Sequence, residues 1–194
     1  MSLRLDKIIY IGNMSKIIEN IKKECSDFLS ITSVYPALKA FDDHGKYFRK
    51  VKVRHKKKPV GFIRIIGDAL QKEHRNIHMR SVVVNGPHSE KDGMKTHYIF
   101  PKNGFKFLFN PRINDHEEYR YSYTKLLGLD LVDKGKALEM MEDSIEYAYT
   151  SDNTSLNDAL KSKKEIIFYG MQYYYTVSSE KYPCYNELIR LLQK

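Results

Sequence analysis

The sequence predicts an α+β fold with a strand-dominated centre, and three observations carry this prediction. Short runs rich in β-branched and aromatic residues occur in the middle and near the end of the chain. Helical periodicity is confined to the segments around them. No internal repeat or low-complexity linker divides the 194 residues, of which 42% are hydrophobic. A chain of this length and composition can bury one substantial core, so we expect a single domain.

The N-terminal part is expected to be helical. Apolar residues recur at spacings of three and four over Ser15–Leu29, with Ser15 as the N-cap. The connector Val34–Ala40, which contains Pro36, is expected to add a short helical turn. Residues 1–44 would then form a helical segment that packs on a core domain of residues 45–194.

The remaining elements follow from alternation, turn residues and helical spacing. The predicted strands are Lys46–Val53, Met79–Val84, Thr96–Phe100, Phe105–Asn110, Glu165–Tyr169 and Gln172–Val177. The predicted helices are Ile63–His74, Leu126–Tyr149, Ser155–Leu160 and Tyr185–Gln193. We expect the strands to form a bent or split antiparallel sheet, with the helices at its periphery.

Positive charge is concentrated in one segment, Lys46–Pro59, which holds eight Lys or Arg residues and no acid. The whole chain carries 33 Lys and Arg and a net charge of +9, so about a quarter of its basic residues lie there. Such a patch favours a partner with phosphate or carboxylate groups. That partner can be nucleic acid, a dinucleotide or an acidic protein surface. The residues expected to bind it are Lys50, Lys52, Lys56, Lys57 and Lys58.

The chain lacks the sequence motifs of several classes of functional site. The chain has no GxxxxGK[ST] loop, no GxGxxG turn and no GxSxG elbow. His74 and His78 share a helical spacing but lack the HExxH order, so we expect no metal. Cys25 and Cys184 are far apart in sequence and are predicted to be free thiols. Without a run of 18 apolar residues, no membrane partner is expected, and the predicted location is the cytoplasm.

Three strand segments share the order of a known family. The first is basic and carries Arg49 and Arg54, the second, HMRSVVVNG, carries Ser81, and the third, KKEIIFYGMQYYYTV, carries Glu165. This arrangement resembles the ADP-ribosyltransferase fold of the Arg-Ser-Glu type, and it is also similar to an uncharacterised phage-borne group. The resemblance implies that Arg49 or Arg54 holds the diphosphate of NAD. It also implies that Ser81 shapes the NAD pocket and that Glu165 is catalytic.

The chemistry of NAD cleavage agrees with these residue types. Breaking the nicotinamide–ribose bond develops positive charge on the ribose, which a carboxylate such as Glu165 stabilises. A guanidinium fork orients a diphosphate better than an ammonium group does. An aromatic side chain such as Tyr47 or Tyr98 is expected to stack on the nicotinamide ring. Lys163 stands where arginine-modifying members of the family have Glu or Gln.

The sequence therefore leads to two functional hypotheses. The first is a phage or mobile-element ADP-ribosyltransferase-like protein that uses NAD to modify a host macromolecule, or a degenerate form that binds a nucleotide without chemistry. The second is a non-enzymatic, basic protein that binds nucleic acid or an acidic host partner, in the host cytoplasm or with the virion. Under the second hypothesis the basic strand itself is the interface.

Overall fold

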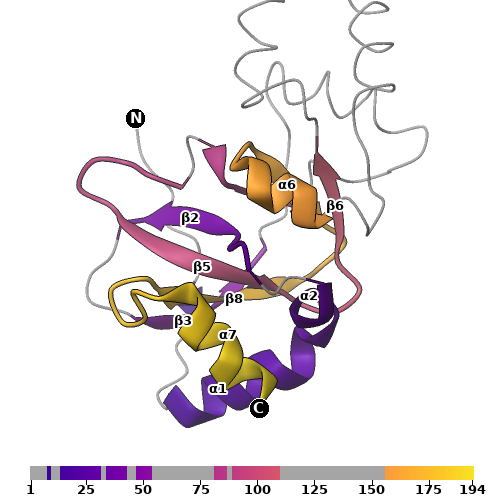
Figure 1. Ribbon diagram of the computed structural model, residues 1–194, viewed down its shortest axis with the longest axis vertical. Helices are drawn as coiled ribbons and strands as arrows, with labels where there is room; N and C mark the ends of the chain where they lie inside the picture. The colour runs from indigo at the N-terminus through magenta and orange to yellow at the C-terminus, as the bar shows by residue number, and fades with distance from the viewer. Residues whose placement is uncertain are drawn as a thin grey trace, which may run out of the picture.

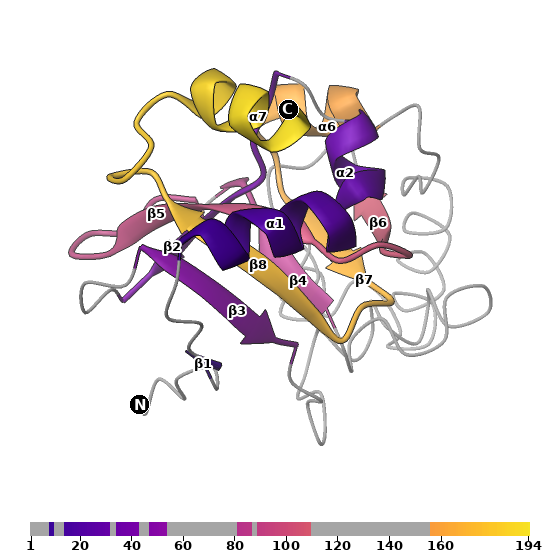
Figure 2. The ribbon, with the colours of Figure 1, turned by 90° about the horizontal axis from the view of Figure 1, so that it is seen from below.

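The computed structural model describes residues 8–9, 14–31, 34–42, 47–53, 81–86, 89–109 and 156–194. These residues form an α+β fold with two antiparallel sheets and helices packed against them (Figures 1 and 2). The predicted fold class is confirmed at this level.

The larger sheet has five strands in the order β1-β3-β8-β5-β2. Its strands are β1 Ile8–Ile9, β2 Leu38–Phe41, β3 Phe48–Lys52, β5 Lys95–Pro101 and β8 Tyr173–Ser178. Strand β8 lies in the middle, where Thr176 pairs with Arg49 of β3 on one side and with Ile99 of β5 on the other. Directly paired residues point to the same face, so this register decides which side chains meet.

The smaller sheet has three strands in the order β4-β7-β6. They are β4 Ser81–Val84, β7 Ile166–Tyr169 and β6 Lys106–Phe109, and all four residues of β7 are buried. The two sheets meet where β4 ends beside the start of β2. There the Asn85 N–H donates to the Leu38 carbonyl, and the Leu38 N–H donates to Asn85 Oδ1, both at 2.7 Å.

The described helices cover one side of the sheets. They are α1 Met14–Glu24, α2 Ser26–Ile31, α6 Leu156–Ser162 and α7 Tyr185–Gln193, and Figure 2 shows α1 and α7 above the larger sheet. Phe28 of α2 makes edge contacts with Phe100 of the larger sheet and Phe168 of the smaller one. One apolar layer therefore runs beneath the helices across both sheets. No helix in the described part of the chain is long and apolar enough to cross a membrane.

Most strand predictions are confirmed to within two residues, but several details differ. The helix expected over Ser15–Leu29 is divided at Cys25 into α1 and α2. The helical turn expected in Val34–Ala40 is wrong, because this segment leads into β2, whose pairing with β5 outweighs local propensity. The segment 1–44 thus contributes strands as well as helices. Strands β5 and β6 are adjacent in sequence yet belong to different sheets, and β1 was not predicted.

Other predictions fall outside the residues that the structure describes. The helices expected over Ile63–His74 and Leu126–Tyr149 are among them. The predicted helices near residues 155 and 185 correspond to α6 and α7. Cys25 and Cys184 are free thiols, as predicted, and the first is buried while the second is exposed.

Candidate functional site

The basic strand β3 divides its charges between two faces. Alternation places Arg49 on the side away from the helices, and Lys50 and Lys52 on the helical side. Lys52 is exposed and Tyr47, just before the strand, is 44% exposed. Arg54, Lys56, Lys57 and Lys58 lie outside the described residues. Of the predicted basic interface, the structure therefore describes Lys50 and Lys52 alone.

Arg49 is almost completely buried, with 2% of its surface exposed. Its guanidinium carbon lies 5.4 Å from the ring centroid of Phe41. Since β8 and β5 separate β3 from β2, these two side chains meet above the middle of the sheet. His97 and Thr176 lie on the same face, fully buried, with His97 Nδ1 and Thr176 Oγ1 hydrogen-bonded at 3.2 Å. The guanidinium is thus displaced from its own strand towards β2.

Ser81 and Glu165 belong to the smaller sheet. Ser81 pairs with Tyr169 and Val84 pairs with Ile166, so Glu165 directly precedes the last paired residue of β7, at the end of the strand pair opposite Ser81. Alternation puts Ser81 and Glu165 on one face, at opposite ends of the strand pair. Glu165 is 8% exposed, whereas Ser81 is partly exposed.

Arg49 and Glu165 share one side of the molecule. The contacts of Phe28 identify the helical side of both sheets through Phe100 and Phe168. Arg49 alternates away from that side in β3, and Glu165 alternates away from it at the start of β7. Strands β2 and β4 meet at the sheet junction. They lie between the Arg49 guanidinium and β7, the strand that Glu165 precedes.

Asn85 occupies this junction, directly after the last residue of β4. Its φ of 59° is left-handed, as is that of Gly86 at 52°, a pair of conformations that Asn-Gly adopts readily. The side chain is buried, with 2% exposed, and its Nδ2 has no hydrogen-bond partner in the described part of the chain. An unsatisfied buried donor is unusual in a folded protein.

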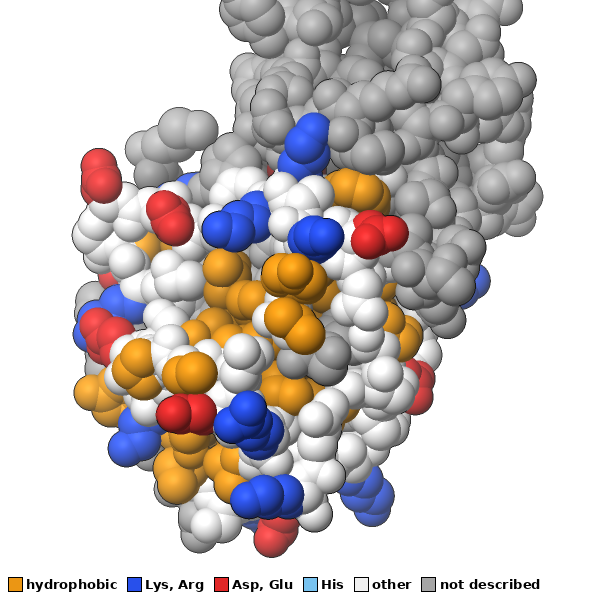
Figure 3. Space-filling view, in the orientation of Figure 1, with side chains coloured by type: hydrophobic (Ala, Val, Ile, Leu, Met, Phe, Trp, Pro, Cys, Tyr) orange, Lys and Arg blue, Asp and Glu red, His pale blue; other side chains and the backbone are white. Residues whose placement is uncertain are grey.

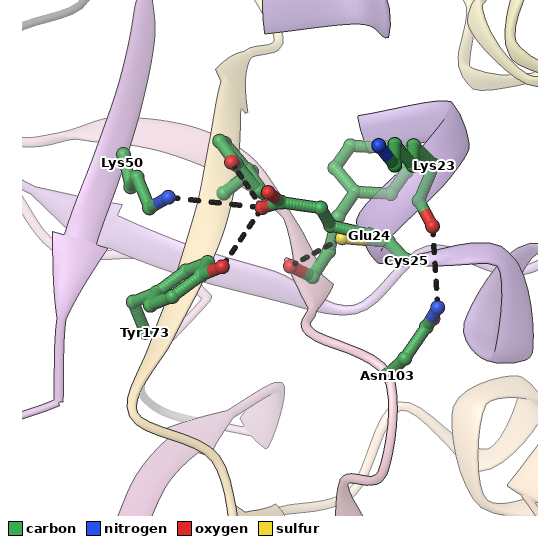
Figure 4. A network of polar contacts seen from close by, with 8 residues as sticks. Lys23, Glu24, Cys25, Lys50, Asn103 and Tyr173 are labelled. Carbon is green, nitrogen blue, oxygen red and sulfur yellow. Dashed lines mark hydrogen bonds and ion pairs between the residues drawn. The ribbon is translucent and has the colours of Figure 1, made fainter. Parts of the chain in front are cut away.

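On the helical side, Lys50 belongs to a separate polar network (Figure 4). Glu24, at the end of α1, accepts hydrogen bonds from the phenols of Tyr173 at 2.9 Å and Tyr175 at 2.5 Å. Lys50 Nζ lies 3.7 Å from the Glu24 carboxylate and 3.7 Å from the ring centroid of Tyr173. Lys102 Nζ lies 4.9 Å from the same ring. Lys50 is therefore engaged within the fold, which weakens its assignment as a free contact for an acidic partner.

The network changes the acidity of its members. Partial burial works to raise the pKa of Glu24, but the hydrogen bonds from Tyr175 and Tyr173 and the charges of Lys50 and Lys102 outweigh it, and the pKa lies below its usual value. Burial and the hydrogen bond to Glu24 raise the pKa of Tyr173 to about 12. These pKa shifts favour a charged carboxylate next to neutral phenols near neutral pH.

The charge distribution bears on the hypothesis of a basic interface. On the face drawn in Figure 3, Lys and Arg side chains are interspersed with Asp and Glu and form no continuous basic surface among the described residues. Within those residues, no group of three or more His, Cys, Asp or Glu side chains could hold a metal ion. His74 and His78 lie outside them.

Comparison with known proteins adds no family assignment. No protein-family model, no curated protein and no solved structure matches the chain. The candidate site therefore depends on its own geometry, with Arg49, Asn85 and Glu165 as its described polar residues.

Proposed function

We propose that this protein is an ADP-ribosyltransferase-like enzyme that binds NAD and transfers its ADP-ribose group to a macromolecule. The observation that carries the proposal is the position of Arg49 and Glu165. Both are buried polar groups on the side away from the helices, one on each sheet, and the guanidinium leans towards the junction of the sheets. An extended dinucleotide lying across that junction would meet the guanidinium at one point and the carboxylate at another.

Each residue then has a distinct chemical role. Arg49 holds the diphosphate through its planar fork. Glu165 stabilises the positive charge that develops on the ribose while the bond between its C1′ and the nicotinamide nitrogen breaks. The bonding electrons leave with nicotinamide, and a nucleophile on the acceptor forms the new bond to C1′ and loses its proton. Tyr47 lies on the same side of β3 as Arg49 by alternation, where its exposed ring can stack on a base.

Burial gives independent support to a functional carboxylate. Glu165 immediately precedes a strand in which every residue is buried, and burying a charged group is costly unless neighbouring groups compensate it. A buried ionisable group is therefore a candidate for a functional role. Ser81 lies at the other end of the β4–β7 strand pair. As part of an NAD pocket, it would contact a different part of the ligand from the part that Glu165 contacts.

The proposal is tested by nicotinamide release from NAD, with Glu165→Gln as the variant. We expect about a 100-fold loss of rate, the effect of removing one transition-state-stabilising group, with NAD affinity changed by less than about threefold. Glu187→Gln, at an exposed position on α7, is the matched control and should behave as the parent protein.

Two results would overturn the proposal. One is release of nicotinamide at equal rates by the parent protein and the Glu165→Gln variant. The other is a protein that neither binds NAD nor gains thermal stability from it, but binds oligonucleotides with a steep dependence on salt. That second result would instead support a basic interface that includes Lys52.

A further inference from the structure

The junction between the sheets contains a hydrogen-bond donor that the fold does not use. Asn85 has 2% of its surface exposed, and within the described part of the chain its Nδ2 lacks a hydrogen-bond partner. Leaving such a group unpaired is unfavourable, because it loses its hydrogen bonds to water without gaining a partner. A natural protein that keeps this arrangement has either a water molecule or a ligand to receive the bond.

Flipping the Asn85 amide, so that Oδ1 and Nδ2 change places, does not satisfy both atoms. The backbone N–H of Leu38 donates to Asn85 Oδ1 at 2.7 Å, and an N–H needs an acceptor. The oxygen must therefore face Leu38, which leaves Nδ2 as the unsatisfied atom. The Asn85 N–H is also bonded to the Leu38 carbonyl at 2.7 Å, so the residue is held on both its backbone and its side chain.

Glu165 lies on the chain segment next to Asn85. Val84 and Ile166 are the last paired residues of β4 and β7, and the Gly86 N–H donates to the Lys163 carbonyl at 2.9 Å, so the two segments stay close past the end of the strands. Asn85 and Glu165 therefore lie on neighbouring segments at the sheet junction.

We propose that Asn85 is a substrate-binding residue that recognises a hydroxyl group of the ribose next to nicotinamide. A hydroxyl is the group that suits this pair, because its O–H can donate to Glu165 while its oxygen accepts from Asn85 Nδ2. This inference rests on the proposed function, and it adds a residue and a point of recognition to the site.

The structural duties of Asn85 do not account for Nδ2. A left-handed φ explains why Asn or Gly stands at this position. The bond from Leu38 explains the need for Oδ1. Asp would also tolerate this φ and offer an oxygen to Leu38, but it would place a charge at a position that is 2% exposed, which favours the amide. What the proposal explains is the use of Nδ2, the atom that neither structural duty requires.

The test compares two ligands in Asn85→Asp and Asn85→Gly variants. ADP-ribose contains the ribose in question, whereas ADP lacks it, and both can be titrated calorimetrically. We expect Asn85→Asp to weaken ADP-ribose binding at least tenfold and to change ADP binding less than twofold. Asn85→Gly keeps the left-handed backbone and should show the same selectivity, which covers the case where a buried Asp prevents folding. Asn186→Asp, at an exposed position, is the control.

The outcomes separate this inference from the proposed function. Selective loss of ADP-ribose affinity supports Asn85 as a ribose contact, even if Glu165→Gln has no effect on nicotinamide release. Unchanged ADP-ribose binding overturns the inference and assigns the acceptor to a water molecule, while the proposed function still stands if Glu165→Gln abolishes release. Equal weakening of ADP and ADP-ribose, or no binding of either by the parent protein, also overturns the inference.

Discussion

Replacing Glu24 by Gln should destabilise the protein measurably, because one carboxylate joins α1 to the larger sheet. It accepts two phenolic hydrogen bonds, from Tyr173 and Tyr175, and lies 3.7 Å from Lys50 Nζ. Hydrogen bonds to a charged group contribute about 1.5–3 kcal/mol each, against about 1 kcal/mol for neutral pairs. Gln keeps one oxygen but loses the charge, and the side chain is 29% exposed, which reduces the effect. We expect a loss of about 2 kcal/mol.

The free energy of unfolding can be measured by urea titration followed by circular dichroism, since the chain has no Trp for fluorescence. A loss of this size corresponds to a Tm lower by about 4–8 °C for a domain of this length. Glu19→Gln removes an exposed carboxylate from the same helix and should change stability by less than about 0.5 kcal/mol. Equal stabilities of the Glu24→Gln and Glu19→Gln variants would refute the reasoning.

The same carboxylate predicts a pH dependence. The pKa of Glu24 is lower in the folded protein than in the unfolded chain, where Glu titrates near 4.3. Its contribution is therefore complete above about pH 5 and is lost as the pH falls through the folded-state pKa. The stability difference between the parent protein and Glu24→Gln should shrink below about pH 4. A difference that stays constant down to pH 3 would contradict this assignment.

Three further predictions concern the turns and the phenols. Gly170→Ala should lower the free energy of unfolding by about 1–2 kcal/mol, because the φ of Gly170 is +81°, a left-handed value. Space is not the obstacle, since an added Cβ would come no closer than 3.5 Å to another atom. An unchanged urea midpoint would contradict this prediction. Asn103→Ala should lower amide-exchange protection at the start of α2 about tenfold. The Asn103 side chain donates from Nδ2 to Ser26 Oγ at 2.9 Å and accepts at Oδ1 from the Asp27 N–H at 3.0 Å. Protection equal to that of the parent protein would refute this prediction. The difference in absorbance at 295 nm between the parent protein and a Tyr173→Phe variant should show Tyr173 ionising near pH 12, and at a lower pH when Glu24 is replaced by Gln. The stabilising effect of the Tyr173 hydrogen bond should persist to about pH 10 and disappear towards pH 12.

The strands could be predicted from the sequence because their signals are local. Alternation and turn residues mark β3, β4, β7 and β8 without reference to the remainder of the chain. What the sequence could not reveal is partnership between distant segments. Nothing in the composition of Leu38–Phe41 distinguishes a strand from a connector, since its extended form depends on pairing with β5.

For the candidate site, the sequence suggested residues but not their contacts. Arg49 and Glu165 were proposed from a family resemblance in the strands that carry them. The displacement of the Arg49 guanidinium towards Phe41 depends on a strand order that sequence alone does not provide. The dipeptide Asn85-Gly86 is ordinarily a turn signal, and nothing in the sequence indicates the unsatisfied Nδ2 on which the role that we propose for Asn85 rests.

Strand β8 connects the stability of the fold to the candidate site. Tyr173 and Tyr175 point to the helical side, where they bond Glu24, and Thr176 lies on the opposite side next to His97. A shift of one residue in register would exchange these two faces, moving Tyr173 and Tyr175 to the Arg49 side and away from Glu24. The Glu24 network therefore stabilises the register that places Thr176 and His97 on the same side as Arg49. Loss of this network should weaken the NAD binding that we propose for that side, without any direct contact between Glu24 and the ligand.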